Sequence, residues 1–500
     1  MASLRDRLKR QLGTSVSGSP PAETPPDDPS PVEAAPASRP IPPPPSVKDR
    51  LRRLHRGSGH RRWNFGPAPE TPRAGEGLHH GYGNPRASVP GDREPTAAAP
   101  VPRRVVETDY GGYIHGRVEL PPDHGHGDLT LASALQVDGA GAVLVGGDSN
   151  LVDFDPTRAL YFDLETTGLP GGGAKIDFDQ DAGPTLAILI GAVRVRPDGG
   201  AIVDQILMRD ARDEYAALHA FEQLLDGIDT LVSFNGKSFD RHVLADRFAM
   251  QRLDGERLRE MPHLDLIHPA RRLYRRAMDS CTLKAIEEAH LGVFRSEDIP
   301  GSEVPRRWRS FARSGDDRRV EAVLDHNTID LLTLLTLSAH LVRCVRAPGA
   351  RLLHPSSLAA AGKLLLERGD EDRGEALLRR LSEGAADDAE PVVYGCLHLL
   401  AEHLRRTERY DEAVSLWRRM RRVAGLSDLR PWTAEAIALE HRLDRVPDAV
   451  ALVERLLEDA GDAGKLWHAE IREFEHRLAR LRKKSARGSA GEGALAAEGA

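Results

Sequence analysis

The spacing of apolar residues divides the chain into regions with different structures. Between residues 158 and 234, apolar residues form short runs typical of β-strands, and helical spacing appears between and after them. Strands are expected at residues 158–164, 185–195, 201–208 and 230–234. Helices are expected at residues 214–225, from about 239, and at 270–276, 283–289 and 318–340. Three adjacent strands followed by alternating helix and strand predict an α/β domain built on a mixed sheet.

The regions on either side of these strands have their own patterns. Residues 106–150 are rich in Gly, Val and Leu and are expected to form short strands that extend the domain, which then covers residues 106–345. Residues 350–482 are helical, and Ala376, Ala413 and Ala449 recur in similar segments 37 and 36 residues apart. This period resembles that of tetratricopeptide repeats, whose small residues allow close helix packing. An ordinary helical bundle is the alternative, and residues 483–500 are expected to be a disordered tail.

The first 105 residues lack any sustained apolar periodicity. They hold 20 of the 35 prolines, and 17 Lys and Arg face 10 Asp and Glu, a net charge of +7. Because the whole chain carries −7, the remaining residues carry −14. We predict a disordered, Pro-rich basic tail over residues 1–105.

Cysteine usage and hydropathy indicate the cellular compartment of the protein. The three cysteines are far apart and match no CxxC spacing, which favours a reduced cytosol. No apolar segment typical of a secretory signal stands near residue 1. The longest helix-like apolar stretch, residues 331–342, is too short and too polar to span a bilayer. We therefore expect a cytoplasmic protein without a membrane partner.

Two carboxylates stand at the end of the strand predicted at residues 158–164. Side chains alternate along a strand, so Asp163 and Glu165 point to the same face about 7 Å apart, while Leu164 points to the other. Neighbouring carboxylates repel one another unless a cation lies between them. Oxygen-rich sites of this kind suit Mg²⁺ or Mn²⁺. The alternative is a pair of solvated acids in a turn.

Residues 163–169 read DLETTGL, which resembles the first motif of the DEDD (DnaQ-like) exonucleases. The second motif of these enzymes resembles residues 231–240, LVSFNGKSFD, which end in Asp240. The third resembles His326-Asn-Thr-Ile-Asp330, whose first and last residues share one helical face. The resemblance implies a ribonuclease H-like fold, followed here by helical repeats, and a 3′→5′ exonuclease that uses two divalent ions. It also implies metal ligands and a general base, namely Asp163, Glu165, Asp240 and Asp330 as ligands and His326 as base.

Three connecting segments make the chain similar to the bacterial YprB-type ribonuclease H-like family, in which tetratricopeptide-like repeats often follow the nuclease domain. They are residues 263–271 (HLDLIHPAR), 281–287 (CTLKAIE) and 295–301 (RSEDIPG). Asp265 and Asp298 in these segments are candidates for supporting the site. One departure concerns His326. The Tyr branch of the superfamily has three residues between its Tyr and the third-motif Asp, and the His branch has four between its His and that Asp. This chain has a His at the shorter spacing, with three residues between His326 and Asp330. A plain helix-surface histidine is therefore the alternative to a general base.

The net charge of −7 is unusual for a protein that binds phosphates. Binding to nucleic acid therefore depends on where the positive charges lie and not on the net charge. Two arginine clusters between the second and third motifs are expected to flank the cleft, although both also fit ordinary solvated helix faces. They are Arg271, Arg272, Arg275 and Arg276, and Arg306, Arg307, Arg309, Arg313, Arg318 and Arg319. The expected partner is single-stranded DNA or RNA, with a protein partner on the helical repeats. A structure-specific endonuclease, or a binding scaffold on the same fold, is the alternative to the exonuclease.

Overall fold

The strand-forming runs of the sequence assemble into one mixed sheet. The computed structural model describes residues 95–168, 185–295, 298–383, 387–463 and 468–498. The sheet has seven strands in the order β1-β2-β7-β6-β5-β8-β9. Their bounds are β1 Arg103–Thr108, β2 Gly111–Leu120, β5 Ala159–Thr166, β6 Ala187–Val195, β7 Ala201–Leu207, β8 Thr230–Ser233 and β9 His263–Asp265.

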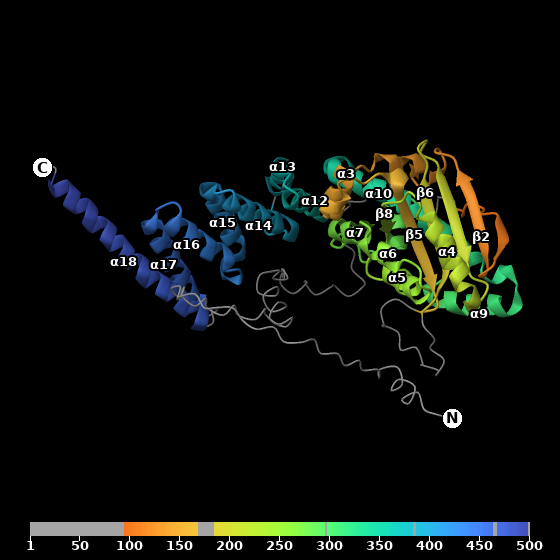
Figure 1. Ribbon diagram of the computed structural model, residues 1–500. Coiled ribbons are helices and arrows are strands. Elements are labelled where there is room, and N and C mark those ends of the chain that lie inside the picture. Colours follow the sequence, from red (N-terminus) through yellow and green to blue (C-terminus); the bar gives the residue numbers. More distant parts are fainter. Residues whose placement is uncertain (1–94, 169–184, 296–297, 384–386, 464–467, 499–500) are drawn as a thin grey trace, which may run out of the picture. The chain divides into compact units, whose positions relative to one another are not determined.

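The direction of the strands brings the acidic motifs to one edge. Strands β1, β2, β7, β6 and β5 pair antiparallel in turn, whereas β8 pairs parallel with β5, and β9 parallel with β8 (Figure 1). The carboxyl ends of β5, β8 and β9 therefore meet at the same edge of the sheet. The mixed sheet expected from the sequence is confirmed.

Helices cover both faces of the sheet, because the central strand is apolar on both sides. Tyr161 belongs to one hydrophobic core and Phe162 to the other. The first core includes α3 (Gly139–Gly146), α7 (Ile267–Tyr274) and most of α10 (Glu321–Arg346). The second includes α4 (Glu214–Leu224), α5 (Asp240–Met250) and α9 (Val304–Ser314). Near-continuous apolar strands are typical of sheets that are covered twice.

Helix α10 is the longest helix of this domain and carries the third motif. By length and composition alone it is apolar enough to cross a membrane, with a mean hydropathy of 1.4 over its best window. However, 83% of that window is buried inside the protein, as in a core helix. Its apolar residues therefore serve to pack the domain.

The N-terminal boundary lies earlier than the sequence indicated. Residues 1–94, most of the expected basic tail, lie outside the described residues. Residues 95–105 belong to the folded domain, because the Thr96 amide donates to the Phe294 carbonyl at 2.7 Å and β1 begins at Arg103. Ala99 is buried in the first core. Residues 95–105 read PTAAAPVPRRV, and such a short run of Ala and Pro gives little periodicity to recognise.

The C-terminal region is helical, as expected, and consecutive helices pack against one another. Its helices are α12 Pro355–Glu367, α13 Glu371–Glu383, α14 Pro391–Arg406, α15 Tyr410–Ala424, α16 Arg430–His441, α17 Val446–Ala463 and α18 His468–Glu498. Ala413 and Ala449 are buried, as the repeat pattern predicts, but Ala376 is exposed. The close approach of α12 and α13 occurs instead at Gly374, where a Cβ would lie 2.9 Å from the Gly362 carbonyl oxygen.

Two features of this region differ from the sequence expectation. Residues 483–498 continue helix α18 instead of forming a tail, and five of them are Ala, which favours helices. The boundary expected near residue 350, between the sheet domain and the helical region, also does not separate two hydrophobic cores. Leu358, Leu364 and Leu377 of α12 and α13 belong to the same core as the sheet. Helices α12 and α13 are thus part of the core of the sheet domain.

Candidate functional site

The first two carboxylates lie on the central strand β5. Asp163 pairs with Gly191 of β6, which pairs in turn with Gln205 of β7. Leu164 packs into the second core on the opposite face, so Asp163 and Glu165 share the other face, as predicted. The register shifts between Glu165 and Thr166, which marks the end of regular pairing beside the site.

Asp240 is placed by a clamped loop between β8 and α5. Asp265 Oδ1 accepts a hydrogen bond from the Asn235 amide at 2.7 Å, and Oδ2 accepts one from the Lys237 amide at 3.0 Å. These bonds hold Asn235 in a left-handed conformation with φ of 72°. A Cβ on Gly236 would lie 2.4 Å from Ser233 Oγ and 2.9 Å from Asp240 Oδ2, so only glycine fits there. Asp265 therefore supports the second motif through the backbone.

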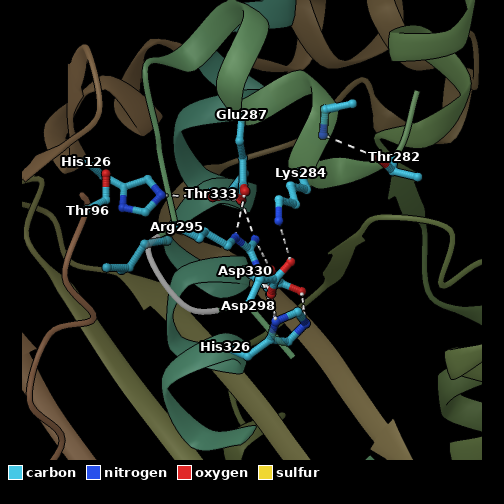
Figure 2. Close-up of polar contacts among 12 residues, drawn as sticks. Thr96, His126, Thr282, Lys284, Glu287, Arg295, Asp298, His326, Asp330 and Thr333 are labelled. Atoms are coloured by element: carbon cyan, nitrogen blue, oxygen red, sulfur yellow. Dashed lines mark hydrogen bonds and ion pairs between the residues drawn. The ribbon is translucent and has the colours of Figure 1, made fainter. Parts of the chain in front are cut away.

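His326 and Asp330 lie one turn apart on α10 and face the strand carboxylates. His326 Nε2 is 3.4 Å from Asp330 Oδ2 and 3.8 Å from Glu165 Oε1. The other ring nitrogen, Nδ1, lies 2.7 Å from Asp298 Oδ1 (Figure 2). Arg295 Nη1, which can only donate, lies 3.1 Å from the same nitrogen, so Nδ1 faces one acceptor and one donor. In the tautomer whose Nδ1 proton is donated to the closer Asp298, the lone pair of Nε2 points toward the acidic site. His326 is thus 19% exposed and engaged, not a free surface histidine.

Asn327 connects this helix to the first motif, a role that sequence reasoning missed. Its Nδ2 donates to Asp163 Oδ2 at 2.9 Å, and its Oδ1 accepts from Gln205 Nε2 at 3.0 Å. A Cβ on Gly191 would lie 2.1 Å from Asn327 Oδ1, so the missing side chain makes room for the amide. Buried polar groups of this kind are costly unless every partner is satisfied. The only sequence signal was a polar residue on the buried face of an apolar helix.

Arg295 and Glu287 are a second pair that sequence reasoning did not single out. Arg295 donates to Asp330 Oδ1, and its Nη2 donates to Glu287 Oε1 at 2.6 Å. Glu287 opens the π-helical turn Glu287–Leu291 and is fully buried. The available signal was weak, because residues 288–294 between them read EAHLGVF and carry a further Glu and a His. Glu287 and Arg295 both lie in the connecting segments, in which the sequence indicated only Asp265 and Asp298 as residues that support the site.

The charges of the carboxylates depend on their burial and their proximity. Burial raises the pKa of Asp163 well above its usual range, and the charges of Asp330 and Asp240 raise it further. Burial raises the pKa of Glu165 from 4.5 to about 9, with the charges of Asp163 and Asp330 adding to the shift. Burial, and then the charge of Asp265, raises the pKa of Asp240 to about 7. The motifs predicted from separate parts of the sequence therefore influence one another in space.

The donor set fits a hard divalent cation. Desolvated carboxylates with raised pKa values gain most from a neighbouring cation, and Mg²⁺ and Mn²⁺ prefer such oxygen ligands. Within the part of the chain that the structure describes, however, no group of three or more His, Cys, Asp or Glu side chains has a geometry that could hold a metal ion. Asp330 is paired with Arg295 instead. The ligands predicted from the sequence are near one another without enclosing an ion site.

The arginine clusters are partly neutralised by nearby acids. Glu303 pairs with Arg306 and Arg307 on α9, and Asp316 pairs with Arg318 and Arg319 just before α10. In the other cluster, on α7 and just beyond it, Arg272 lies 3.7 Å from Glu367. Arg271 and Arg275 are exposed. A role of either cluster beside the cleft remains a prediction.

Comparisons with known proteins bear on the fold of this domain. Residues 160–342 match a family model described as RNase_H superfamily. The chain is 29% identical over 374 residues to the uncharacterized protein YprB of Bacillus subtilis (strain 168). The matched region covers 73% of this chain and 85% of that protein.

A solved structure was also found. It is the family B DNA polymerase from the hyperthermophilic archaeon Pyrobaculum calidifontis, with 12% identity over 56% of this chain and 51% of that chain. Its TM-score of 0.30 is too low to support an argument. The family model and the similarity to YprB, together with the mixed sheet, identify residues 160–342 as a ribonuclease H-like domain in a chain that is similar to YprB over most of its length.

Proposed function

We propose that the protein is a metal-dependent nuclease, most specifically a 3′→5′ exonuclease acting on single-stranded DNA or RNA. A ribonuclease H-like fold suggests nuclease-type activity on nucleic acids. The observation that supports the finer proposal is that four carboxylates from three separate segments meet at one edge of the sheet. There the negative charges of the neighbouring acids raise the pKa values of Asp163 and Glu165, the other acids being Asp240 and Asp330. Mutually repelling buried acids are costly for a protein that only binds partners.

In this proposal the four carboxylates hold two divalent ions. Bound there, such ions neutralise charge on the phosphate and lower the pKa of water. His326 Nε2 is the chain's own proton acceptor, because it is the ring nitrogen that faces Glu165 and Asp330. Asp298 fixes the ring through Nδ1, as a carboxylate does in other catalytic histidine pairs. Asn327 keeps Asp163 oriented on the strand.

End-labelled substrates test the direction of hydrolysis. Purified protein is incubated with Mn²⁺ and single-stranded DNA or RNA labelled at one end. We expect 5′-labelled strands to shorten stepwise and 3′-labelled strands to release the label at once as a mononucleotide. Circular single-stranded DNA is expected to resist. Cleavage of the circle would instead support the structure-specific endonuclease, and tight binding without hydrolysis would support the scaffold.

Replacement of one ligand assigns the activity to this site. Asp163→Asn removes a charge but keeps an oxygen that accepts from Asn327, so it should abolish hydrolysis without unfolding the protein. Asp198→Asn is the matched control, since Asp198 is exposed in the turn between β6 and β7 and pairs only with Arg196 among the described ion pairs. Activity that survives Asp163→Asn would contradict the site assignment.

A further inference from the structure

Arg295 is a fully formed cation inside the acidic site. Its side chain is only 3% exposed, and that of its partner Glu287 is not exposed at all. Figure 2 shows the guanidinium lying between Glu287 on one side and Asp330, Asp298 and His326 on the other. An arginine does not lose its proton in proteins, so this position carries a permanent positive charge.

The guanidinium uses its donors on several partners at once. Nε donates to Glu287 Oε2 at 2.8 Å and Nη2 donates to Glu287 Oε1 at 2.6 Å, a two-pronged contact. Nη2 also donates to Asp330 Oδ1, and Nη1 lies 3.5 Å from Asp298 Oδ1. Arg295 thereby binds one oxygen of Asp330 and leaves Oδ2 facing His326.

The far side of the arginine is held rigidly. Thr333 Oγ1 donates to Glu287 Oε1 at 2.6 Å, and His126 Nε2 lies 2.8 Å from the same hydroxyl. Burial lowers the pKa of His126 to about 3, so its ring is neutral and fits as a hydrogen-bonding partner. The chain of contacts runs from β3 (Gly125–His126) through α10 to the π-helical turn (Figure 2). Arg295 cannot swing away from Asp330 without stranding Glu287 as an unpaired buried charge.

The other acids of the site lack such a partner. Among the described ion pairs, Asp163 and Asp240 have none, and Glu165 reaches only His326 at 3.8 Å. The positive charge of Arg295 is therefore placed on the Asp330 side of the acidic group. This asymmetry has a consequence for any divalent ion that enters.

We propose that Arg295 is a resident counter-cation of the acidic site: it keeps Asp330 in place when no metal is bound and lowers the affinity of the site for divalent cations. The inference rests on the proposed metal-dependent function and concerns how metal loading is regulated. A fixed positive charge next to Asp330 repels an incoming divalent ion, and repulsion at such distances is strong inside a protein. Arg295 is a positioning residue here and takes no part in the reaction itself.

Metal binding without nucleic acid tests this proposal. The variant pair Glu287→Gln with Arg295→Met removes the cation and also removes the buried charge it would strand, while Gln keeps an acceptor for Thr333. Isothermal titration with Mn²⁺ should give a Kd about three- to tenfold lower than in the parent, a factor of ten being about 1.4 kcal/mol. The rise in melting temperature on adding Mn²⁺ should also be larger than in the parent.

Two further variants separate charge from structure. Arg295→Lys keeps the positive charge, so its Kd for Mn²⁺ should stay within twofold of the parent. This single change can still be measured if the Glu287→Gln/Arg295→Met protein does not fold. Arg421→Met with Glu435→Gln is the matched control, because this ion pair, whose glutamate is buried, lies in the C-terminal helices α15 and α16. It should leave the Kd unchanged.

The outcomes distinguish this inference from the proposed nuclease function. A folded Glu287→Gln/Arg295→Met protein with an unchanged or higher Kd overturns the counter-cation, even if the parent degrades nucleic acid. So does a Kd for Arg295→Lys that falls as far as that of the pair. A lower Kd for the pair supports it, even if the parent shows no hydrolysis. If neither the parent nor the Glu287→Gln/Arg295→Met protein binds Mn²⁺, both proposals are overturned.

Discussion

At the scale of single residues, the site is defined by acids whose ionisation costs free energy in the absence of a cation. Glu165 shows this most directly, since burial and then neighbouring charges raise its pKa from 4.5 to about 9. Such a group favours the folded state below pH 4.5, and that contribution is lost as the pH rises toward 9. The sign follows because the folded protein retains a proton that the unfolded chain releases.

Glu165→Gln should therefore flatten the dependence of metal-free stability on pH. We expect the variant and the parent to differ little in melting temperature near pH 5, and the variant to melt higher at pH 9 in EDTA. The measurement is the difference in melting temperature between variant and parent as a function of pH. Buried histidines such as His263, whose pKa burial lowers to about 3, affect both proteins equally and cancel in this difference. Parallel curves from pH 5 to 9 would contradict the burial of a charged Glu165.

His326 has a geometry that suits a general base, and its replacement tests that role. His326→Ala should lower kcat by about 10²–10⁴-fold, the usual effect of losing a positioned base. His326→Tyr should retain more activity, because Tyr occurs at this spacing in one branch of the superfamily. Asp298→Asn should cost about tenfold, since it only orients the ring. Near-complete activity in both His326 variants would remove this residue from the mechanism.

At the scale of elements, the site depends on how closely α10 approaches the sheet. Gly191→Ala would place a methyl group 2.1 Å from Asn327 Oδ1, and the fully buried amide has no room to withdraw. We expect a loss of about 1–3 kcal/mol in the free energy of unfolding. The activity should fall as well, because Asp163 loses its partner.

The matched control for this change is Gly301→Ala. A Cβ at Gly301 meets nothing within 4 Å, so stability and activity should be those of the parent. Thermal melting and initial rates on the same labelled strand give both readouts. If Gly191→Ala were as stable and active as Gly301→Ala, Asn327 would not be the bridge that positions Asp163.

At the scale of the whole molecule, the N-terminal boundary of the domain is the clearest correction. Residues 95–500 should retain specific activity within a few-fold of the full chain. Removing residues 1–104 cuts into β1, removes buried Ala99 and breaks both hydrogen bonds between Thr96 and Phe294, the residue next to Arg295. That shorter protein should melt at a lower temperature and lose activity. Equal melting temperatures for the two truncations would show that residues 95–104 add nothing to the fold.

The sequence alone determined strands β5 to β8, helices α4, α5 and α10, and the segments that carry Asp163, Asp240 and Asp330, but not strand β9 or helix α9. These are local signals, since alternation along a strand and spacing along a helix depend on neighbouring residues only. The repeat pattern in the C-terminal third was less informative. Ala376 has the right spacing but is exposed, because the close helix contact moved to Gly374.

Only the tertiary structure decided which residues support the acids. Asn327 reaches Asp163 across 164 positions of sequence, and Arg295 reaches Asp330 across 35. No periodicity links such pairs, and each partner alone reads as an ordinary polar residue. Their effect also depends on burial, because water would screen the charge of Arg295 at the surface and leave the pKa of Glu165 near its usual value. The charge balance of the site thus follows from packing, which local sequence does not specify.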